Sequence, residues 1–116
     1  MSFPARVLLR HADGSRTPVD PDEVYLLEAD GDETRVRMRA ADELVDVRRL
    51  GELLQMFNDH SVVRIHRSYA VNIGRIRRVR PRDSEGWEVK LEPPVNRVLP
   101  VSESRAADLW AAFGEG

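Results

Sequence analysis

The sequence predicts a mainly all-β domain that also contains one short helix and a C-terminal helix. Two observations lead to this fold class. Short apolar runs alternate with turn residues along most of the chain, at the spacing of strands in an all-β protein. Apolar residues at helical spacing occur in one segment near the middle of the chain and in another at its end. With 116 residues, a single domain that spans residues 1–116 is expected.

Four strands are expected in the first half of the chain: residues 6–10, 16–19, 24–29 and 34–39. Asp13 and Gly14 separate the first two, and this pair favours a hairpin turn because glycine accepts a positive φ. Pro18 has no amide hydrogen for a strand ladder, which indicates an edge strand. In the fourth run Val36 and Met38 alternate with arginines, the period of a strand with one buried face.

Five more strands are expected after the middle of the chain: residues 62–66, 69–72, 76–80, 87–91 and 97–101. Alternation along the second of them places Tyr69, Val71 and Ile73 in the core. Leucine and phenylalanine side chains at i, i+3, i+4 and i+7 predict the short helix over residues 50–57. Similar spacing predicts the last helix over residues 106–113. Either Ser102 or Ser104 is expected to be its N-cap.

Composition excludes several classes of function. The chain has no cysteine, which rules out disulfides, thiol nucleophiles and zinc–thiolate sites. It has no apolar run long enough to span a bilayer and no apolar leader, so a cytoplasmic protein without membrane contact is expected. The three histidines His11, His60 and His66 lack metal-ligand spacing, and there is no phosphate-binding glycine loop or nucleophile elbow. We therefore expect no enzymatic activity, no metal and no cofactor.

Charge is unevenly distributed along a chain whose formal net charge is only -2. Residues 17–34 carry seven acids and no basic residue, whereas residues 64–82 carry seven arginines and no acid. An arginine-rich segment suits a phosphate backbone, because each neutralised phosphate releases counterions. The alternative is a solvated strand face whose arginines pair with the acidic segment across the sheet. On the first interpretation, residues 64–82 contribute a positive strip that faces DNA, and residues 17–34 lie mostly away from it. Because strand neighbours point to opposite faces, only some of these arginines can lie beside DNA.

Part of the arginine-rich stretch resembles a known family signature. Residues 64–80 read Arg-Ile-His-Arg-Ser-Tyr-Ala-Val-Asn-Ile-Gly-Arg-Ile-Arg-Arg-Val-Arg. This string resembles the signature of the LytTR DNA-binding domain, the output module of many bacterial response regulators. Residues 24–31, 50–53 and 99–102 are similar to other parts of that domain in the right order, so the resemblance covers about residues 6–113. It implies an elongated β-β-β sandwich of about ten strands whose loops enter successive major grooves of DNA.

The resemblance also implies three DNA-contacting loops. The expected contact residues are Thr34 and Arg35 in the first loop, His66, Arg67 and Ser68 in the second, and Ser102, Ser104 and Arg105 in the third. Arg67 is expected to read a base, because its planar guanidinium can contact O6 and N7 of guanine together. His66 and Ser68 suit phosphate oxygens or the internal hydrogen bonds of the turn. A protonated His66 would gain phosphate affinity below about pH 6.5.

Two acids depart from the family pattern. Glu103 stands at a third-loop position where the family usually has arginine, and Glu33 stands where an aromatic or polar side chain is common. Both indicate an altered sequence preference, weaker binding or a role without DNA. The alternative function is a protein-interaction module that keeps the fold and has lost DNA binding. Its apolar patch would consist of Leu109, Trp110 and Phe113, unless these side chains pack in the core.

The partners expected from the resemblance are double-stranded DNA and a second protomer, bound to direct repeats about one helical turn apart. The chain is too short to contain a receiver domain beside this module, so we expect a stand-alone transcription regulator. Its regulation would then depend on protein level, on a ligand or on an unidentified regulatory protein.

Overall fold

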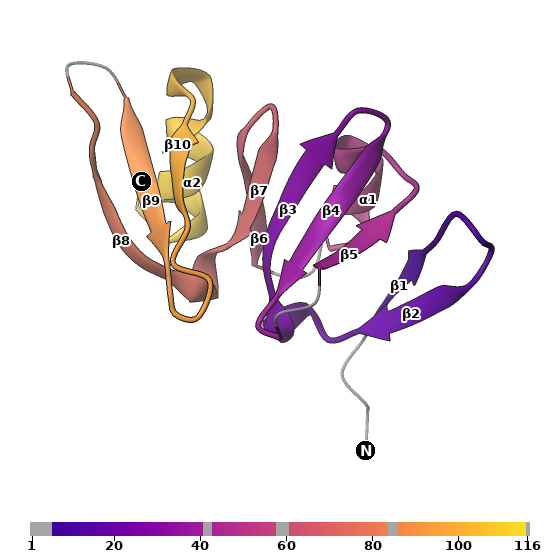
Figure 1. Cartoon of the computed structure of the whole chain (residues 1–116). Helices are drawn as coiled ribbons and strands as arrows, with labels where there is room; N and C mark the ends of the chain where they lie inside the picture. The colour runs from indigo at the N-terminus through magenta and orange to yellow at the C-terminus, as the bar shows by residue number, and fades with distance from the viewer. Residues whose placement is uncertain (1–5, 41–42, 58–60, 84–85, 116) are drawn as a thin grey trace.

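The computed structural model describes residues 6–40, 43–57, 61–83 and 86–115, so that His60 lies outside the described residues. Three antiparallel sheets follow one another across the molecule, which measures 45 × 38 × 25 Å (Figure 1). They are a two-stranded hairpin, a five-stranded central sheet and a three-stranded sheet. None of the helices in the described part is long and apolar enough to cross a membrane. The mainly all-β sandwich predicted from the sequence is confirmed.

The strands are β1 (Val7–Arg10), β2 (Arg16–Val19), β3 (Val24–Asp30), β4 (Glu33–Met38), β5 (Glu43–Asp46), β6 (Val62–His66), β7 (Tyr69–Asn72), β8 (Ile76–Pro81), β9 (Trp87–Leu91) and β10 (Val98–Val101). The helices are α1 (Leu50–Gln55) and α2 (Ala106–Ala112), with three 3-10 turns, η1 (Pro21–Glu23), η2 (Ile73–Arg75) and η3 (Glu103–Arg105). Every predicted strand is present. The sequence missed β5, because this strand is short and has only two apolar residues between its terminal acids.

The central sheet has the strand order β5-β4-β3-β7-β6, and each neighbouring pair in it is antiparallel. Its turns follow the sequence signals. Gly31, between β3 and β4, has a φ of 60°, and Gly14, between β1 and β2, has a φ of 88°. Residues with a Cβ rarely adopt such values. Pro18 lies in β2, which pairs only with β1 among the described strands, so its edge position is confirmed.

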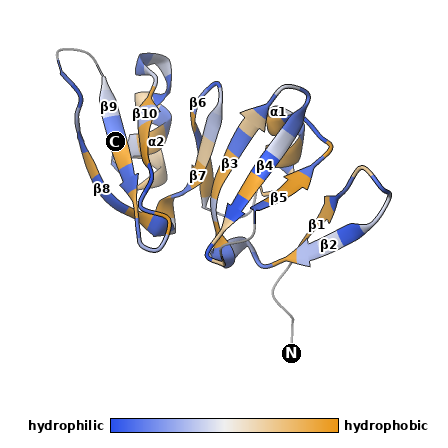
Figure 2. Ribbon diagram, in the orientation of Figure 1, coloured by the Kyte–Doolittle hydropathy of each residue, from blue (hydrophilic) through white to orange (hydrophobic). Residues whose placement is uncertain are grey.

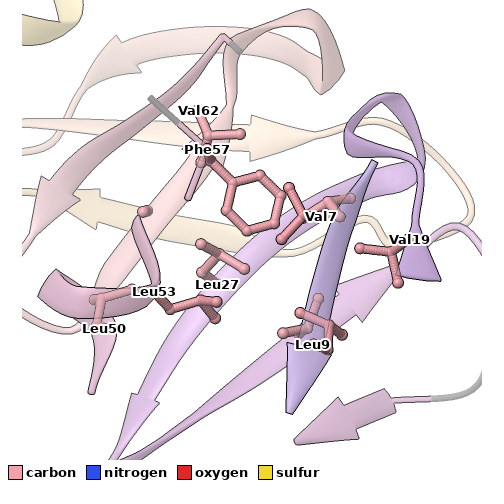
Figure 3. Close-up of a cluster of buried hydrophobic side chains, with 11 residues drawn as sticks. Val7, Leu9, Val19, Leu27, Leu50, Leu53, Phe57 and Val62 are labelled. Carbon is pink, nitrogen blue, oxygen red and sulfur yellow. The ribbon is translucent and has the colours of Figure 1, made fainter. Parts of the chain in front are cut away.

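One core lies between the hairpin β1–β2, helix α1 and one face of the central sheet (Figure 3). The predicted helical stripe enters this core, where Leu53 and Phe57 are completely buried and Leu50 is nearly so. Figure 2 shows hydrophobic and hydrophilic residues alternating along the strands. In β4 this alternation buries Val36 and exposes Arg35, as predicted. The buried side chains of β4 therefore fix the orientation of the β3–β4 hairpin relative to this core.

The second core lies between the other face of the central sheet, the three-stranded sheet β10-β9-β8 and helix α2. Val71 is fully buried in it, and Tyr69 and Ile73 pack against it, as predicted. Leu109 is completely buried, which anchors α2 beside β6. This packing holds α2 next to β6, which is an edge strand of the central sheet.

The predicted serine cap of the last helix is wrong. After β10 the chain first makes the turn η3, and α2 begins only after Arg105, whose side chain makes no capping hydrogen bond within the described structure. Ser102 precedes η3, but its hydroxyl donates to the Ile65 carbonyl (3.4 Å) and does not accept a capping hydrogen bond from the turn. The serine therefore fastens the segment after β10 to β6 instead of capping a helix.

Candidate nucleic-acid interface

The three segments predicted to contact DNA meet at one edge of the molecule. Because β3 is antiparallel to both β4 and β7, the β3–β4 turn and the β6–β7 turn lie at the same end of the central sheet, at the top in Figure 1. The Ala29 N–H donates to the Ser68 carbonyl (2.8 Å) and ties the first segment to the second. The Ser102 N–H donates to the Ile65 carbonyl (2.8 Å) and ties the third to the second. The fold thus joins segments that are far apart in the sequence.

Arg64 fixes the main chain of the β6–β7 turn. Its Nε donates to the His66 carbonyl (3.3 Å), and its Nη2 donates to the Arg67 carbonyl. Its Nη1 lies beside α1, at 3.4 Å from the place where a Cβ on Gly51 would stand. These contacts hold the main chain of the turn in place, whereas the Arg67 side chain is exposed.

A groove of about 610 Å³ lies between the two hairpin turns and the start of α1, and we call it the basic groove. Its lining residues are Arg49, Arg64 and Arg67, together with Ala29, Gly31, Asp32, Leu50, Gly51 and Glu52. Arg49 and Asp32 form an exposed ion pair, with 2.8 Å between Nη2 and Oδ1. Exposed pairs of this kind are weak, so Arg49 can exchange the carboxylate for a phosphate oxygen.

Positive charge accumulates around His66. Burial lowers the pKa of this imidazole below its usual value, and the charges of Arg67, Arg105 and Arg64 lower it further. Burial and the charge of Arg105 also lower the pKa of Arg64. Arg105 follows β10, whereas Arg64 lies in β6 and Arg67 lies in the β6–β7 turn. The second and third segments therefore share one positive field, which suits an anionic partner.

The His66 ring is part of the turn itself. The Ser68 N–H donates to Nδ1 of His66 (3.1 Å), and the ring contacts Tyr69 with 5.3 Å between the ring centroids. Nδ1 is therefore the acceptor nitrogen, and the neutral ring carries its proton on Nε2. The turn hydrogen bond, one of the two roles expected for His66 and Ser68, is present. Contact with a phosphate stays a prediction, and the lowered pKa moves any gain from protonation to a lower pH.

We expect His66 to titrate below pH 6.5, and its pKa to rise when Arg67 is replaced by alanine, because one charge that opposes protonation is removed. Since the folded-state pKa is lower than the unfolded one, the unfolded chain binds this proton more readily. The group therefore reduces stability as the pH falls below about 6.5. An NMR titration of the imidazole in both proteins checks the shift. An unchanged pKa in Arg67→Ala would show that the two side chains are not coupled.

The first segment differs most from its prediction. Thr34 is completely buried, and its hydroxyl donates to the Arg48 carbonyl (2.8 Å). Because it falls on the inward face of β4, its side chain supports the core and does not reach DNA, which corrects the expected contact. Arg35 is exposed and paired, with 3.0 Å between its Nε and Oδ2 of Asp30. Glu33 is exposed at the turn.

Thr34→Val should lower the free energy of unfolding by about 1–2 kcal/mol, because the buried Arg48 carbonyl loses its donor. DNA affinity should stay unchanged. Urea denaturation and a DNA titration measure the two effects. Ser104→Ala, at an exposed position of the third segment, is the control and should show the opposite pattern of unchanged stability and weaker DNA binding. A loss of DNA affinity in Thr34→Val without a loss of stability would restore the original assignment.

The third segment places its residues at different depths. Ser104 and Glu103 are exposed in η3, whereas Ser102 and Arg105 are half-buried. Ser102 is turned toward β6 by its hydrogen bonds to Ile65. The segment therefore offers one exposed hydroxyl, one exposed acid and the guanidinium of Arg105 beside the second segment. Their contact with DNA stays a prediction.

The arginines of residues 64–82 do not form one strip. Arg75 lies in η2, at the other end of β7, where its Nη2 donates to the Asp22 carbonyl (2.7 Å) and its guanidinium lies 5.1 Å from the Tyr25 ring centroid. Four others lie on or directly after β8 in the three-stranded sheet. Asp32, from the acidic segment, lines the basic groove. The predicted separation of basic and acidic segments therefore does not hold at the basic groove, and the face that meets DNA stays a prediction.

From the sequence, Arg48 and Arg49 precede the short helix and could touch phosphate, although a solvated helix start is the favoured interpretation, and Arg64 has no role of its own. Arg48 and Arg49 both precede α1, but Arg48 is buried against Asp46, with 2.8 Å between Nη2 and Oδ2, whereas Arg49 is exposed in the groove. The usable signal is a strand-like alternation, because residues 45–49 are alternately exposed and buried. This alternation continues from β5, so it can be used to separate Arg48 from Arg49 only if β5 is first recognised as a strand.

Comparisons with known proteins point to one family. A family model described as the LytTr DNA-binding domain matches residues 14–114. Among solved structures, the chain is similar to the "LytTr DNA-binding domain of putative methyl-accepting/DNA response regulator from Bacillus cereus". The TM-score is 0.77 at 26% sequence identity, and the match covers 97% of this chain and 99% of the other. A search of the curated proteins found no match.

Proposed function

The chain belongs to the LytTR family of DNA-binding domains, and from this we propose that it recognises a specific sequence of double-stranded DNA through the major groove and so regulates transcription. The observation that carries the proposal is the convergence of the three loop segments at one edge. This edge presents the exposed side chains of Arg49 and Arg67 beside Arg105. A family of DNA-binding domains also fits a binding role better than catalysis.

The dimensions of the molecule support contact with two successive major grooves. Major grooves on one face of DNA repeat every 34–36 Å or so. The longest dimension of the protein is 45 Å, so one molecule laid along the duplex reaches across that interval. Loops of this kind can enter a groove without a recognition helix, as other strand-based DNA readers do.

We assign different roles to the arginines of this edge. Arg67 projects from a stiffened turn and is the base reader, since its fork fits the guanine edge. Arg49 and Arg105 are phosphate ligands, which give affinity and fix the register on the duplex. Arg35, like Arg49, reaches DNA only after it leaves its carboxylate partner, which is Asp30.

Glu103→Gln should raise DNA affinity about 1.4- to 5-fold at low salt, because removal of an exposed like charge is worth roughly 0.2–1 kcal/mol. The gain should shrink as salt is added. Fluorescence anisotropy with a labelled duplex measures it, and Asp108→Asn, an exposed position in α2, is the control. A loss of affinity with a changed preference at one base pair would show instead that Glu103 accepts a hydrogen bond from a cytosine amino group.

The function itself is tested by selection from a random duplex pool, followed by binding of the selected sequence over a salt series. Specific binding should enrich one motif, and log affinity should fall with log salt by about 0.9 for each phosphate contacted. Absence of an enriched motif, or binding independent of salt, would contradict the proposal.

We further propose that two protomers bind direct repeats about one helical turn apart. A head-to-tail arrangement places both protomers on the same face of the duplex only if the repeats are in phase. Insertion of about half a turn, roughly 5 bp, should therefore abolish cooperative binding. Electrophoretic mobility shifts with one and two repeats measure this, and equal affinity at both spacings would favour independent monomers.

The alternative of a protein-interaction module has less support. Its expected apolar patch is incomplete, because Leu109 is completely buried in the core and Trp110 packs against it. Of the three side chains, Phe113 alone is largely exposed, with 46% of its surface accessible. One exposed aromatic residue is ordinary for a soluble protein surface.

A further inference from the structure

A second cavity lies away from the basic groove, between the three-stranded sheet and α2. It has a volume of about 330 Å³ and is lined by Val79 of β8, Trp87 of β9, Trp110 of α2 and Glu115 after it. None of these residues lines the basic groove. The DNA-binding role proposed above makes no use of this cavity.

The two tryptophans give the cavity its walls. Trp87 and Trp110 meet edge to face, with 4.8 Å between ring centroids and an interplanar angle of 84°. Both are half-buried, so each ring keeps part of its surface open. Val79 is also half-buried and adds an aliphatic surface beside them. Indole faces attract cations more strongly than other aromatic side chains do.

The end of α2 places Glu115, an exposed residue, at the rim of this cavity. Gly114 has a φ of 81°, its N–H donates to the Ala111 carbonyl (3.0 Å), and the Glu115 N–H donates to the Trp110 carbonyl (2.9 Å). This pair of bonds is the Schellman motif, in which the last residue normally makes an apolar contact with the residue that here is Trp110. A glutamate occupies that place instead. It makes no ion pair with any residue that the structure describes.

We propose that this cavity binds a small apolar cation, such as an aromatic or alkyl amine or a quaternary ammonium compound. The indole surfaces take the apolar body and the positive charge, and the Glu115 carboxylate pairs with the same charge. A neutral ligand would make no ion pair with the Glu115 carboxylate, and an anion would be repelled by it. The volume lies near the lower end of the range for small-molecule pockets, which fits one ring and an ammonium group.

The position of α2 connects this site with the third DNA-contacting segment. Helix α2 begins at Ala106, directly after Ser104 and Arg105. A ligand that contacts Trp110 therefore acts on the helix that directly follows these residues, so its occupancy should change DNA affinity. By linkage, DNA must change ligand affinity by the same factor. This regulatory step, unlike the binding site itself, depends on the proposed DNA-binding function.

Intrinsic fluorescence tests the site directly, because the protein has just two tryptophans and both line the cavity. Titration with benzyltrimethylammonium should give a saturable change in tryptophan emission, whereas phenylacetate should give none. Glu115→Gln should weaken the binding about fivefold. Asp108→Asn, which removes an exposed acid of the same helix away from the cavity, should leave it unchanged.

Three outcomes would overturn the binding site. They are no saturable change with the ammonium probe, equal binding of phenylacetate, and equal loss of affinity in both acid variants. A tryptophan emission that depends on protein concentration and not on the probe would assign the cavity to a second copy of the chain. If the probe binds as expected and DNA affinity is the same with and without it, the regulatory role fails while the ligand site stands. That result is distinct from an absence of DNA binding.

Discussion

Arg67→Ala should weaken binding to the selected DNA sequence by roughly 5- to 150-fold, which corresponds to the loss of about 1–3 kcal/mol for one bidentate contact to guanine. It should also relax the preference at a single base pair. The physical reason is the arrangement of the β6–β7 turn. Arg64 donates to the carbonyls of His66 and Arg67, so the main chain of the turn is held where the Arg67 side chain lines the groove.

Arg67→Lys separates the charge of Arg67 from its shape. Lysine keeps the positive charge but lacks the planar fork. Binding to random DNA should therefore stay close to that of the unaltered protein, while discrimination among sequences falls as in the alanine variant. The salt dependence of the lysine variant should also be unchanged, since the number of neutralised phosphates is the same.

Arg78→Ala is the matched control, because Arg78 is equally exposed but lies on β8, in the outer sheet, and does not line the basic groove. It should leave sequence preference unchanged. Competition binding with the selected duplex and with single-base variants measures all three proteins. A uniform decrease of affinity for every sequence in Arg67→Ala would assign Arg67 to phosphate instead of a base.

The fold followed from local patterns, whereas the candidate site did not follow from them completely. The apolar stripe over residues 50–57, which predicts α1, and the alternation in β4 can be recognised in the sequence because each buries one face with a fixed period. Burial of a particular polar residue depends on contacts with distant segments. In β4 the period alone places Thr34 on the same inward face as Val36, and its expected DNA contact came from the family resemblance. Its partner, the Arg48 carbonyl, is distant in sequence and could not be identified from the period.

Charge was the least predictable feature. A run of arginines in sequence becomes a basic surface only if the chain keeps them on one side of the molecule. Here Arg64 and Arg67 lie on the groove, whereas Arg75 lies beyond the far end of β7 against Asp22 and Tyr25. Strand reversal separated them, so the net charge of a segment says little about the field at the site.

The neighbouring residues Arg48 and Arg49 offer the sharpest test of the packing. Arg48 forms a two-pronged contact with Asp46, at 2.8 Å (Nη2 to Oδ2) and 3.0 Å (Nε to Oδ1), and donates to the Leu8 carbonyl at 3.0 Å. The two side chains of the pair are 6% and 0% exposed. The Arg10 N–H also donates to Asp46 (2.9 Å). This cluster joins β1 to the end of β5.

Arg48→Ala should lower the free energy of unfolding by about 3–5 kcal/mol, because it leaves a buried carboxylate without its partner. For a domain whose total stability is about 5–15 kcal/mol, this is a large fraction. Arg49→Ala removes an exposed pair and should change stability by less than about 1 kcal/mol, but it should weaken DNA binding. Chemical denaturation and DNA titration of both variants check this. Equal stability of the two variants would contradict the structural role of the pair.

The pH dependence of the unfolding free energy in the same two variants tests whether the buried charge of Asp46 causes the loss of stability. Burial alone would raise the pKa of Asp46, but hydrogen bonds from the Arg48 side chain and from the N–H groups of Arg10 and Arg48 outweigh it and hold the pKa below 3.8. In the unaltered protein this group therefore contributes stability at neutral pH that is lost as the pH falls through the folded-state pKa.

Without the Arg48 guanidinium, burial dominates and the pKa of Asp46 should rise above its unfolded value. The contribution of Asp46 to the pH dependence of stability then changes sign, because acidification neutralises the buried carboxylate and removes the cost of keeping its charge away from water. The stability difference between Arg48→Ala and the unaltered protein should consequently shrink as the pH is lowered from about 7 to about 4. For Arg49→Ala, whose partner Asp32 is exposed, no comparable narrowing is expected. A constant gap for Arg48→Ala would show that its effect arises from lost packing and not from the buried charge.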